Sequence, residues 1–228
     1  MEKDKSFRTL FFSSAVRFSA GVFCLFVLFL IPFFLFSCSS PDTKILNISS
    51  TVIFEFDDAE KTPGCRLSVF TETSGDERRV SEIRAEHEAS SLVWKCRFPR
   101  KFTAQKKSVW AGYTNFVPAT GSLLPQGRYK LVYVDASGEE TEGNFSVAYP
   151  EKIAESHVAD FPGILRGAEE IYAVYDVDGN LMYFAEKKEN WKSASDIKND
   201  YGLADKYRVC YRINKGSVIC MMPEEKLP

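Results

Sequence analysis

Three features of the sequence predict a mainly β protein, in which an antiparallel β-sandwich is followed by a small α+β unit. Apolar and polar residues alternate with a period of two in several runs between residues 47 and 149, as in half-buried strands. Turn residues separate these runs at spacings of about ten residues. The composition changes at Tyr149-Pro150, after which two hairpin patterns and one helix pattern follow. A chain of 228 residues is long enough for both units after an N-terminal leader.

The leader covers residues 1–37 and has the composition of an export signal. Four basic residues precede an uncharged apolar run: Lys3, Lys5, Arg8 and Arg17. A charged start followed by an apolar stretch is typical of secretory signals. The run from Ser19 to Ser37 is also long enough for an uncleaved signal anchor, because about 20 apolar residues cross a bilayer as a helix. The residues after the run separate these two interpretations.

The residues Leu35-Phe36-Ser37-Cys38 resemble the bacterial lipobox, the motif in which signal peptidase II cleaves before the cysteine that receives diacylglycerol. Phe36 stands where most lipoboxes have a small residue. The resemblance implies lipidation of Cys38 and a lipidated tether over residues 38–46. This tether begins with small and polar residues, whereas a membrane-spanning anchor is expected to be followed by a basic cluster. By analogy with the family, the lack of aspartate directly after the cysteine favours the outer membrane over the inner membrane.

The net charge gives no support for a nucleic-acid partner. The formal net charge of the whole chain is -2. The leader carries four basic and two acidic residues, so its removal leaves a body of about -4. Proteins that recognise nucleic acids have a basic face or stripe. We therefore expect no nucleic-acid binding.

Alternating runs form the expected sandwich over residues 47–149. Val52, Phe54 and Phe56 share one face of the first run, which ends at turn residues around Pro63-Gly64. Further runs follow at residues 67–72, 78–86, 92–98 and 109–117. Short strands at such spacings argue for two packed antiparallel sheets.

The stretch LPQGRYKLVYVDASGEETEGNFSV closes the expected sandwich and contains its clearest hairpin. Tyr129, Leu131 and Tyr133 alternate up to a turn near Gly138. This stretch resembles the last two strands of an immunoglobulin-like (Ig-like) or fibronectin type III-like module. The resemblance implies the sandwich class alone, because Trp94 does not have the position relative to the cysteines that it has in antibody-type domains.

Residues 150–228 are expected to form the small α+β unit. Its first hairpin turns at Asp178-Gly179, a strong two-residue turn signal. A helix is predicted from Ser193 to Tyr201, with serine at its start and Gly202 directly after its end. A second hairpin closes the chain. We expect limited proteolysis to cut first between residues 148 and 168, at the boundary between the two units.

The body contains four cysteines, which permit two disulfides: Cys65, Cys96, Cys210 and Cys220. An even number of cysteines in an exported chain is typical of disulfide pairing. With Asn214-Lys215-Gly216 as a three-residue loop, Cys210 faces Cys220 across the last hairpin. Cys65 and Cys96 are then left for each other. The alternative is that all four are reduced and buried as small apolar side chains.

Residue types that carry catalysis are sparse, and we expect no enzymatic activity, no metal site and no cofactor. Of the two histidines, His87 is interpreted as a solvated residue on a polar strand edge. Ser156, His157 and Asp160 favour a hydrolase only weakly, since neighbouring residues rarely face one another. Acidic residues around Asp178 fit a turn better than a calcium loop. No phosphate-binding glycine loop and no CxxC motif occur.

Two segments are candidates for an interaction surface. One is a basic run with interleaved phenylalanines, which includes Arg100 and Lys101 and fits contact with an anionic membrane surface or polymer. The other is an aromatic-rich strand with Trp110, Tyr113 and Phe116. The alternatives are a solvated loop for the basic run and an ordinary core strand for the aromatic one.

These observations predict a membrane-anchored lipoprotein of the cell envelope that acts as an interaction or structural module. Its expected partners are the membrane, through the lipid anchor, and an envelope protein or polymer. One alternative is a binder of a small molecule or glycan in a cleft between the two units. A hydrolase that uses Ser156 and His157 is the other alternative.

Replacement of Cys38 by alanine should leave an unprocessed precursor, because the lipidated cysteine is the residue before which the leader is cut. Metabolic labelling with palmitate, followed by gel analysis of precursor and mature forms, measures this. The wild-type protein should carry the label and the variant should not. A wild-type protein without label would refute lipidation.

Overall fold

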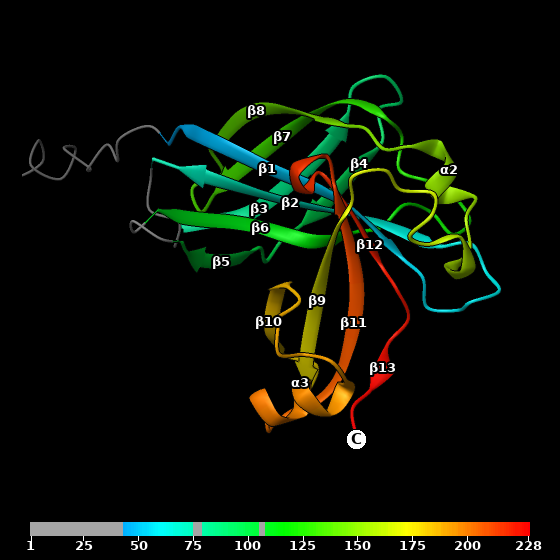
Figure 1. The fold of residues 1–228 in the computed structure, drawn as a ribbon. Coiled ribbons are helices and arrows are strands. Elements are labelled where there is room, and N and C mark those ends of the chain that lie inside the picture. The colour runs from blue at the N-terminus through cyan, green and yellow to red at the C-terminus, as the bar shows by residue number, and fades with distance from the viewer. Residues whose placement is uncertain (1–42, 75–78, 105–107) are drawn as a thin grey trace, which may run out of the picture. The chain divides into compact units, whose positions relative to one another are not determined.

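Two β-sheets make up most of the folded body in the computed structural model. The structure describes residues 43–74, 79–104 and 108–228, and within these ranges it contains thirteen strands and two α-helices. A nine-stranded sheet and a four-stranded sheet enclose a common core (Figure 1). The predicted mainly β class and the sandwich arrangement are therefore confirmed. Thr43–Pro228 is one compact unit.

Every run that was predicted for the sandwich contains a strand. The strands before residue 150 are β1 (Ile45–Glu55), β2 (Gly64–Thr73), β3 (Val80–His87), β4 (Val93–Cys96), β5 (Arg100–Thr103), β6 (Val109–Phe116), β7 (Gly127–Asp135) and β8 (Glu140–Val147). β5 lies in the basic run for which a solvated loop was the alternative interpretation. The elements after residue 150 are α2 (Glu151–Ala154), β9 (Glu169–Asp176), β10 (Leu181–Glu186), α3 (Ala194–Asp200), β11 (Ala204–Ile213), β12 (Val218–Met221) and β13 (Glu225–Lys226).

The strands from the last part of the chain extend the same sheet that begins with β1. The strand order is β10-β9-β11-β12-β1-β2-β6-β5 in the larger sheet, with β13 paired to β11, and β4-β3-β7-β8 in the smaller one. β1 and β12 run parallel, with Val52 opposite Val218 and Glu55 opposite Met221. The sheet is thus continuous across residues 149 and 150, where a boundary between two units was expected (Figure 1). First cleavage between residues 148 and 168 stays a prediction.

The main hydrophobic core fills the space between the two sheets. Phe54 and Leu67 enter it from the larger sheet, and Ile83, Leu131 and Tyr133 enter it from the smaller one, each at most 1% exposed. Burial of one such side chain stabilises a fold by about 1.5–3 kcal/mol. The last strands contribute further buried residues to this core: Tyr211, Ile213, Val218 and Cys220.

A second, smaller core lies between α3 and one face of β9 and β11. Trp191 and Ile197 pack there against Tyr172 and Val174 of β9, and all four are buried. Because successive residues of a strand point to opposite faces, the alternate residues of β9 lie on the other side of the sheet. This core holds α3 against the sheet.

The predicted helix is confirmed in α3. Ser193 is its N-cap, and the Asp196 carboxylate accepts a hydrogen bond from the Ser193 backbone N–H at 2.8 Å. The Ser193 side chain faces the Asp196 backbone N–H in return, which completes a capping box. Such a box satisfies amide groups that the first helical turn leaves without partners. In the three described ranges, no helix has both the length and the apolar character needed to cross a membrane.

The loop of the last hairpin is one residue longer than predicted. Ile213 pairs with Val218, so the loop runs from Asn214 to Ser217 instead of ending at Gly216. Successive residues with positive φ angles, from Asn214 to Gly216, turn the chain inside this loop. The register of the two strands therefore differs by one residue from the prediction.

This register overturns the predicted disulfide between Cys210 and Cys220. Cys210 lies opposite Met221, and Cys220 lies opposite Tyr211. A register change of one residue moves a side chain to the other face of its sheet. Cys220 accordingly lies in the main core, whereas Cys210 packs with Ile171 on the other face. Both thiols are free.

The predicted disulfide between Cys65 and Cys96 is not formed either. Both are free, buried thiols in the main core. Cys65 belongs to β2 of the larger sheet, and Cys96 belongs to β4 at the edge of the smaller sheet. All four cysteines of the body therefore act as small buried apolar residues.

Cys210 and Cys220 should be unreactive toward thiol reagents in the native protein and reactive after denaturation. Burial raises the pKa of each thiol to about 12, so little thiolate is present at neutral pH. Alkylation with and without denaturant, followed by mass spectrometry of non-reduced peptides, measures this. Recovery of a peptide in which residues 210 and 220 are linked would contradict the register described above.

Candidate functional site

β5 forms one edge of the nine-stranded sheet. It pairs with β6, and all residues of Arg100–Thr103 are exposed. No described strand pairs with its outer side, so β5 is an edge strand of the described sheet. An edge of this kind can accept an extended segment of a partner as an added strand.

An aromatic cluster lies beside this edge. Phe102 stacks on Trp110, with ring centroids 6.5 Å apart and planes 9° apart, and it meets Phe70 edge to face at 5.3 Å. The Phe70 ring also covers Gly112 of β6. A Cβ at Gly112 would lie 2.5 Å from this ring and 2.2 Å from the carbonyl oxygen of Val69. Glycine is therefore required for the ring to lie flat on the sheet.

We use the name β5 surface for four side chains on one face of the sheet: Phe70, Arg100, Phe102 and Trp110. Arg100 pairs with Gly112, and Phe102 pairs with Trp110, so these positions share a face. Lys101 pairs with Ala111, whose side chain belongs to the main core, and it therefore projects from the other face. Of the two basic residues that were singled out from the sequence, only Arg100 belongs to the β5 surface.

Tyr113 and Phe116 do not belong to the β5 surface, contrary to the prediction. Phe116 is 2% exposed, and Tyr113 packs against the main core with its ring 5.2 Å from that of Phe116. Two effects turn them inward. Tyr113 is three residues after Trp110 in a regular stretch of β6, so it lies on the opposite face from Trp110. Leu67 pairs with Phe116 and Val69 pairs with Tyr113, so β6 has one residue more than β2 between these pairs, and this β-bulge brings Phe116 to the core face as well. Only Trp110 of the three predicted aromatic residues lies on the β5 surface.

The segment between β4 and β5 carries two exposed side chains. The side chain of Arg97 is 84% exposed, and its Nε lies 4.0 Å from Glu82 of β3, so Arg97 is directed toward the outer face of the four-stranded sheet. Phe98 is 91% exposed. Two further lysines of the basic run, Lys106 and Lys107, lie outside the described residues. Exposed aromatic rings beside arginines are the residue types most enriched at protein interfaces.

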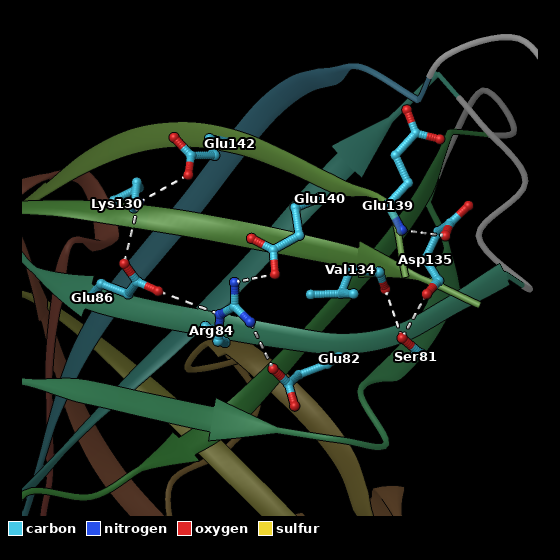
Figure 2. Close-up of polar contacts among 10 residues, drawn as sticks. All are labelled: Ser81, Glu82, Arg84, Glu86, Lys130, Val134, Asp135, Glu139, Glu140 and Glu142. Carbon is cyan, nitrogen blue, oxygen red and sulfur yellow. Dashed lines mark hydrogen bonds and ion pairs between the residues drawn. The ribbon is translucent and has the colours of Figure 1, made fainter. Parts of the chain in front are cut away.

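The outer face of the four-stranded sheet is different, because ion pairs cover it (Figure 2). The Arg84 guanidinium lies 2.6 Å from Glu140 and 3.3 Å from both Glu82 and Glu86. The hydrogen bond between Arg84 and Glu140 raises the pKa of Arg84 and lowers the pKa of Glu140. Arg84 and Glu140 are therefore both charged at neutral pH and form an ion pair.

Lys130 extends this network along β7. Its ammonium lies 2.9 Å from Glu142 and 3.3 Å from Glu86 (Figure 2). Val132, which stands between Arg84 and Glu142 in the strand register, is fully buried although it lies on the outer face. Long charged side chains thus cover the apolar area of this face. Among the described residues at its centre, no aromatic ring is exposed as Phe102 is on the β5 surface.

A cavity of about 670 Å³ lies at one end of the sandwich, where α2 meets two loops. Its lining includes Cys65, Leu124, Gln126, Tyr149, Glu151 and Glu155. The Tyr149 hydroxyl donates to the Leu124 carbonyl oxygen at 2.6 Å, and the Tyr149 backbone N–H donates to Gln126 Oε1 at 3.0 Å. Burial raises the pKa of Tyr149 and keeps its hydroxyl neutral. The volume lies within the range of small-ligand sites, about 300–1,000 Å³.

The residues considered for hydrolysis make structural contacts. Ser156 Oγ donates to the Ile153 carbonyl oxygen at 2.7 Å, and the His157 backbone N–H donates to the Asp160 carboxylate at 2.8 Å. The first contact lies at the end of α2, and the second lies at the start of a 3-10 turn over residues 158–160. Neither contact joins the serine hydroxyl to the histidine ring.

His87 lies inside the sandwich, and its interpretation as a solvated edge residue is wrong. It is 5% exposed, because its position alternates with the outward-facing Glu86 and Glu88. Its Nδ1 lies 2.7 Å from Ser90 Oγ, and its ring packs 4.9 Å from that of Tyr129. These contacts are those of a core histidine.

The acidic residues near Asp178 form a turn. The Asp176 carboxylate accepts hydrogen bonds from the backbone N–H groups of Asp178 and Asn180, at 3.0 and 2.7 Å. Across the described ranges, no group of three or more histidine, cysteine, aspartate or glutamate side chains is arranged to hold a metal ion. The carboxylate of Asp176 thus stabilises the loop between β9 and β10.

Comparisons with known proteins do not assign this fold to a family. No protein-family model matches the chain, no curated protein matches it significantly, and no solved structure matches it significantly. The class of protein is therefore defined by the fold alone, a β-sandwich whose larger sheet is extended by strands from the C-terminal part of the chain.

Replacement of Gly112 by alanine should destabilise the protein by about 1–3 kcal/mol, because the new methyl group meets the Phe70 ring and the Val69 carbonyl oxygen. Chemical denaturation measures the free energy of unfolding. Gly64→Ala is the matched control, because Gly64 lies in β2 and a Cβ there meets no atom within 4 Å. Equal stability of the two variants would show that Phe70 does not lie over β6 as described.

Proposed function

We propose that this protein is a membrane-anchored lipoprotein of the cell envelope that acts as an interaction or structural module, and that its β5 surface contacts the partner. The observation that carries the proposal is that exposed aromatic and basic side chains lie on β5, the edge strand of the larger sheet among the described strands. The ion-paired outer face of the other sheet provides the contrast, since its charges are already satisfied within the chain.

The anchor is proposed from the leader alone. Lipidation of Cys38 would tether the body to a bilayer, with the outer membrane favoured over the inner one. β1 begins at Ile45, so the tether between Cys38 and β1 is short. At about 3.3–3.6 Å for each extended residue, it keeps the sandwich within roughly 25 Å of the bilayer. The partner of the β5 surface is then expected to lie close to the membrane.

The chemistry of the β5 surface indicates an acidic protein segment or polymer as the partner. Arg100 belongs to the surface and is exposed. A carboxylate or phosphate beside its guanidinium group gains charge-assisted hydrogen bonds, while Phe102 supplies apolar contact area. We expect no nucleic-acid partner, because the body as a whole is acidic.

A second candidate function is the binding of a small molecule or glycan in the cavity at the end of the sandwich. The cavity volume of about 670 Å³ favours this function. Its lining mixes apolar groups such as Leu124 with the carboxylates of Glu151 and Glu155. A polar or cationic ligand fits this composition better than an entirely apolar one.

The variants Phe102→Ser and Arg100→Glu should each weaken capture of the partner by about tenfold or more, because loss of a central interface anchor costs on the order of 2 kcal/mol. The measurement is a pull-down from detergent-solubilised envelope with the mature protein as bait, followed by affinity measurement on the captured component. Val177→Ser is the matched control, since Val177 is 77% exposed and lies in the loop between β9 and β10. Equal capture by all three variants would remove the β5 surface from the proposal.

A further inference from the structure

Three aromatic rings from separate segments converge on one ammonium group. Tyr183 lies on β10, Trp191 lies just before α3, and Tyr201 lies at the C-terminal end of α3. The Lys188 ammonium lies 5.4, 5.2 and 4.6 Å from their ring centroids. The planes of Tyr183 and Trp191 differ by 65°, and those of Trp191 and Tyr201 differ by 75°. The rings therefore form the walls of a box.

A carboxylate completes this arrangement. Asp200 lies 3.0 Å from the Lys188 ammonium, and it also accepts a hydrogen bond from Trp191 Nε1–H at 2.8 Å. The hydrogen bond from Trp191 and the contact with Lys188 both lower the pKa of Asp200. The indole thus holds the carboxylate in place independently of the lysine. We use the name ammonium cage for Tyr183, Trp191, Tyr201 and Asp200.

The walls of the ammonium cage are anchored without help from Lys188. Trp191 is 2% exposed and belongs to the second core, where it packs against Tyr172 with ring centroids 5.9 Å apart. Tyr183 and Tyr201 pack against the same core. The box is therefore built by the docking of α3 on the sheet.

Lys188, by contrast, is accessible to solvent. It lies in the segment between β10 and α3, and its side chain is 36% exposed. The contacts that hold the three rings on the second core do not involve this side chain. A lysine of this kind competes with an external cation as a tethered ligand at millimolar effective concentration or above.

We propose that the ammonium cage is a binding site for a primary alkylammonium group, and that Lys188 is an internal ligand that the external amine displaces. Three π faces attract a cation, and the carboxylate accepts a hydrogen bond from an N–H group of the ligand. A quaternary ammonium satisfies the rings but has no N–H group for Asp200. The ammonium cage lies at the β10 end of the strand order and the β5 surface lies at the other end, so this inference does not depend on the proposed function.

The test uses the full mature chain and its Lys188→Ala variant, titrated with propylammonium chloride. The NMR signal of the Trp191 indole N–H reports on the ammonium cage, because this group donates a hydrogen bond to the Asp200 carboxylate. The variant should show a saturable shift, and the wild-type protein should need about tenfold more ligand for the same shift. Lys188→Gln, which keeps most of the side-chain length, replaces Lys188→Ala if the latter does not fold. Sodium chloride at the same ionic strength is the control for salt effects.

Three comparisons make the result specific. Lys187→Ala should behave as the wild type, because Lys187 lies over Tyr172 and outside the ammonium cage. Asp200→Asn in the Lys188→Ala background should weaken propylammonium binding. Nα-acetyl-lysine N-methylamide distinguishes a lysine side chain of a partner protein from a free amine as the source of the ammonium group, since tighter binding than propylammonium indicates the former. No saturable shift in either Lys188 variant, or tighter binding of tetramethylammonium than of propylammonium, would overturn the proposal.

Discussion

The parallel pairing of β1 with β12 is the interaction on which the rest of the structure depends. The Val52 N–H donates to the Ser217 carbonyl oxygen and the Phe56 N–H donates to the Met221 carbonyl oxygen, each at 2.9 Å. β1 also pairs with β2 on its other side. Without the contact between β1 and β12, the larger sheet would divide into one part from the start of the chain and one from its end.

The two parts of the chain are joined by packing as well as by this backbone pairing. Phe161 follows the expected boundary, and its ring centroid lies 4.8 Å from that of Phe56, directly after β1, and 5.7 Å from that of Tyr211 in β11. Cys220 of β12 lies in the main core with Phe54. Removal of the C-terminal strands would therefore expose one side of the sandwich core. Because the two parts share apolar contacts, we expect their stabilities to be coupled.

The two proposed recognition sites lie at the two ends of one sheet. At one end, the β5 surface joins an edge strand to exposed aromatic and basic groups. At the other end, β10 contributes Tyr183 to the ammonium cage. The four-stranded sheet has its outer charges paired with one another around Arg84. Its outer face therefore leaves fewer charged groups for a partner than the β5 surface does.

The sequence by itself determined the local elements of this protein. The alternating runs identified the strands of the sandwich other than β5, and Ser193 with the glycine after Tyr201 identified α3. These features depend on side-chain period and on capping, which residues close together in the chain control. The hairpin between β9 and β10 was predictable for the same reason, since Asp178-Gly179 turns the chain locally.

Only the tertiary structure decided which faces these elements present and which distant segments meet. The β-bulge that turns Phe116 inward depends on pairing with β2, and the separation of Cys210 from Cys220 depends on the register in which Ile213 pairs with Val218. The parallel contact of β1 with β12 joins segments more than 160 residues apart, and no local pattern encodes it. The ammonium cage needs the docking of α3 on the sheet, because Tyr183, Trp191 and Tyr201 follow no regular spacing in the sequence. In each case the arrangement is stabilised by the burial of side chains from distant parts of the chain. The pattern of neighbouring residues does not specify which distant side chains are buried together.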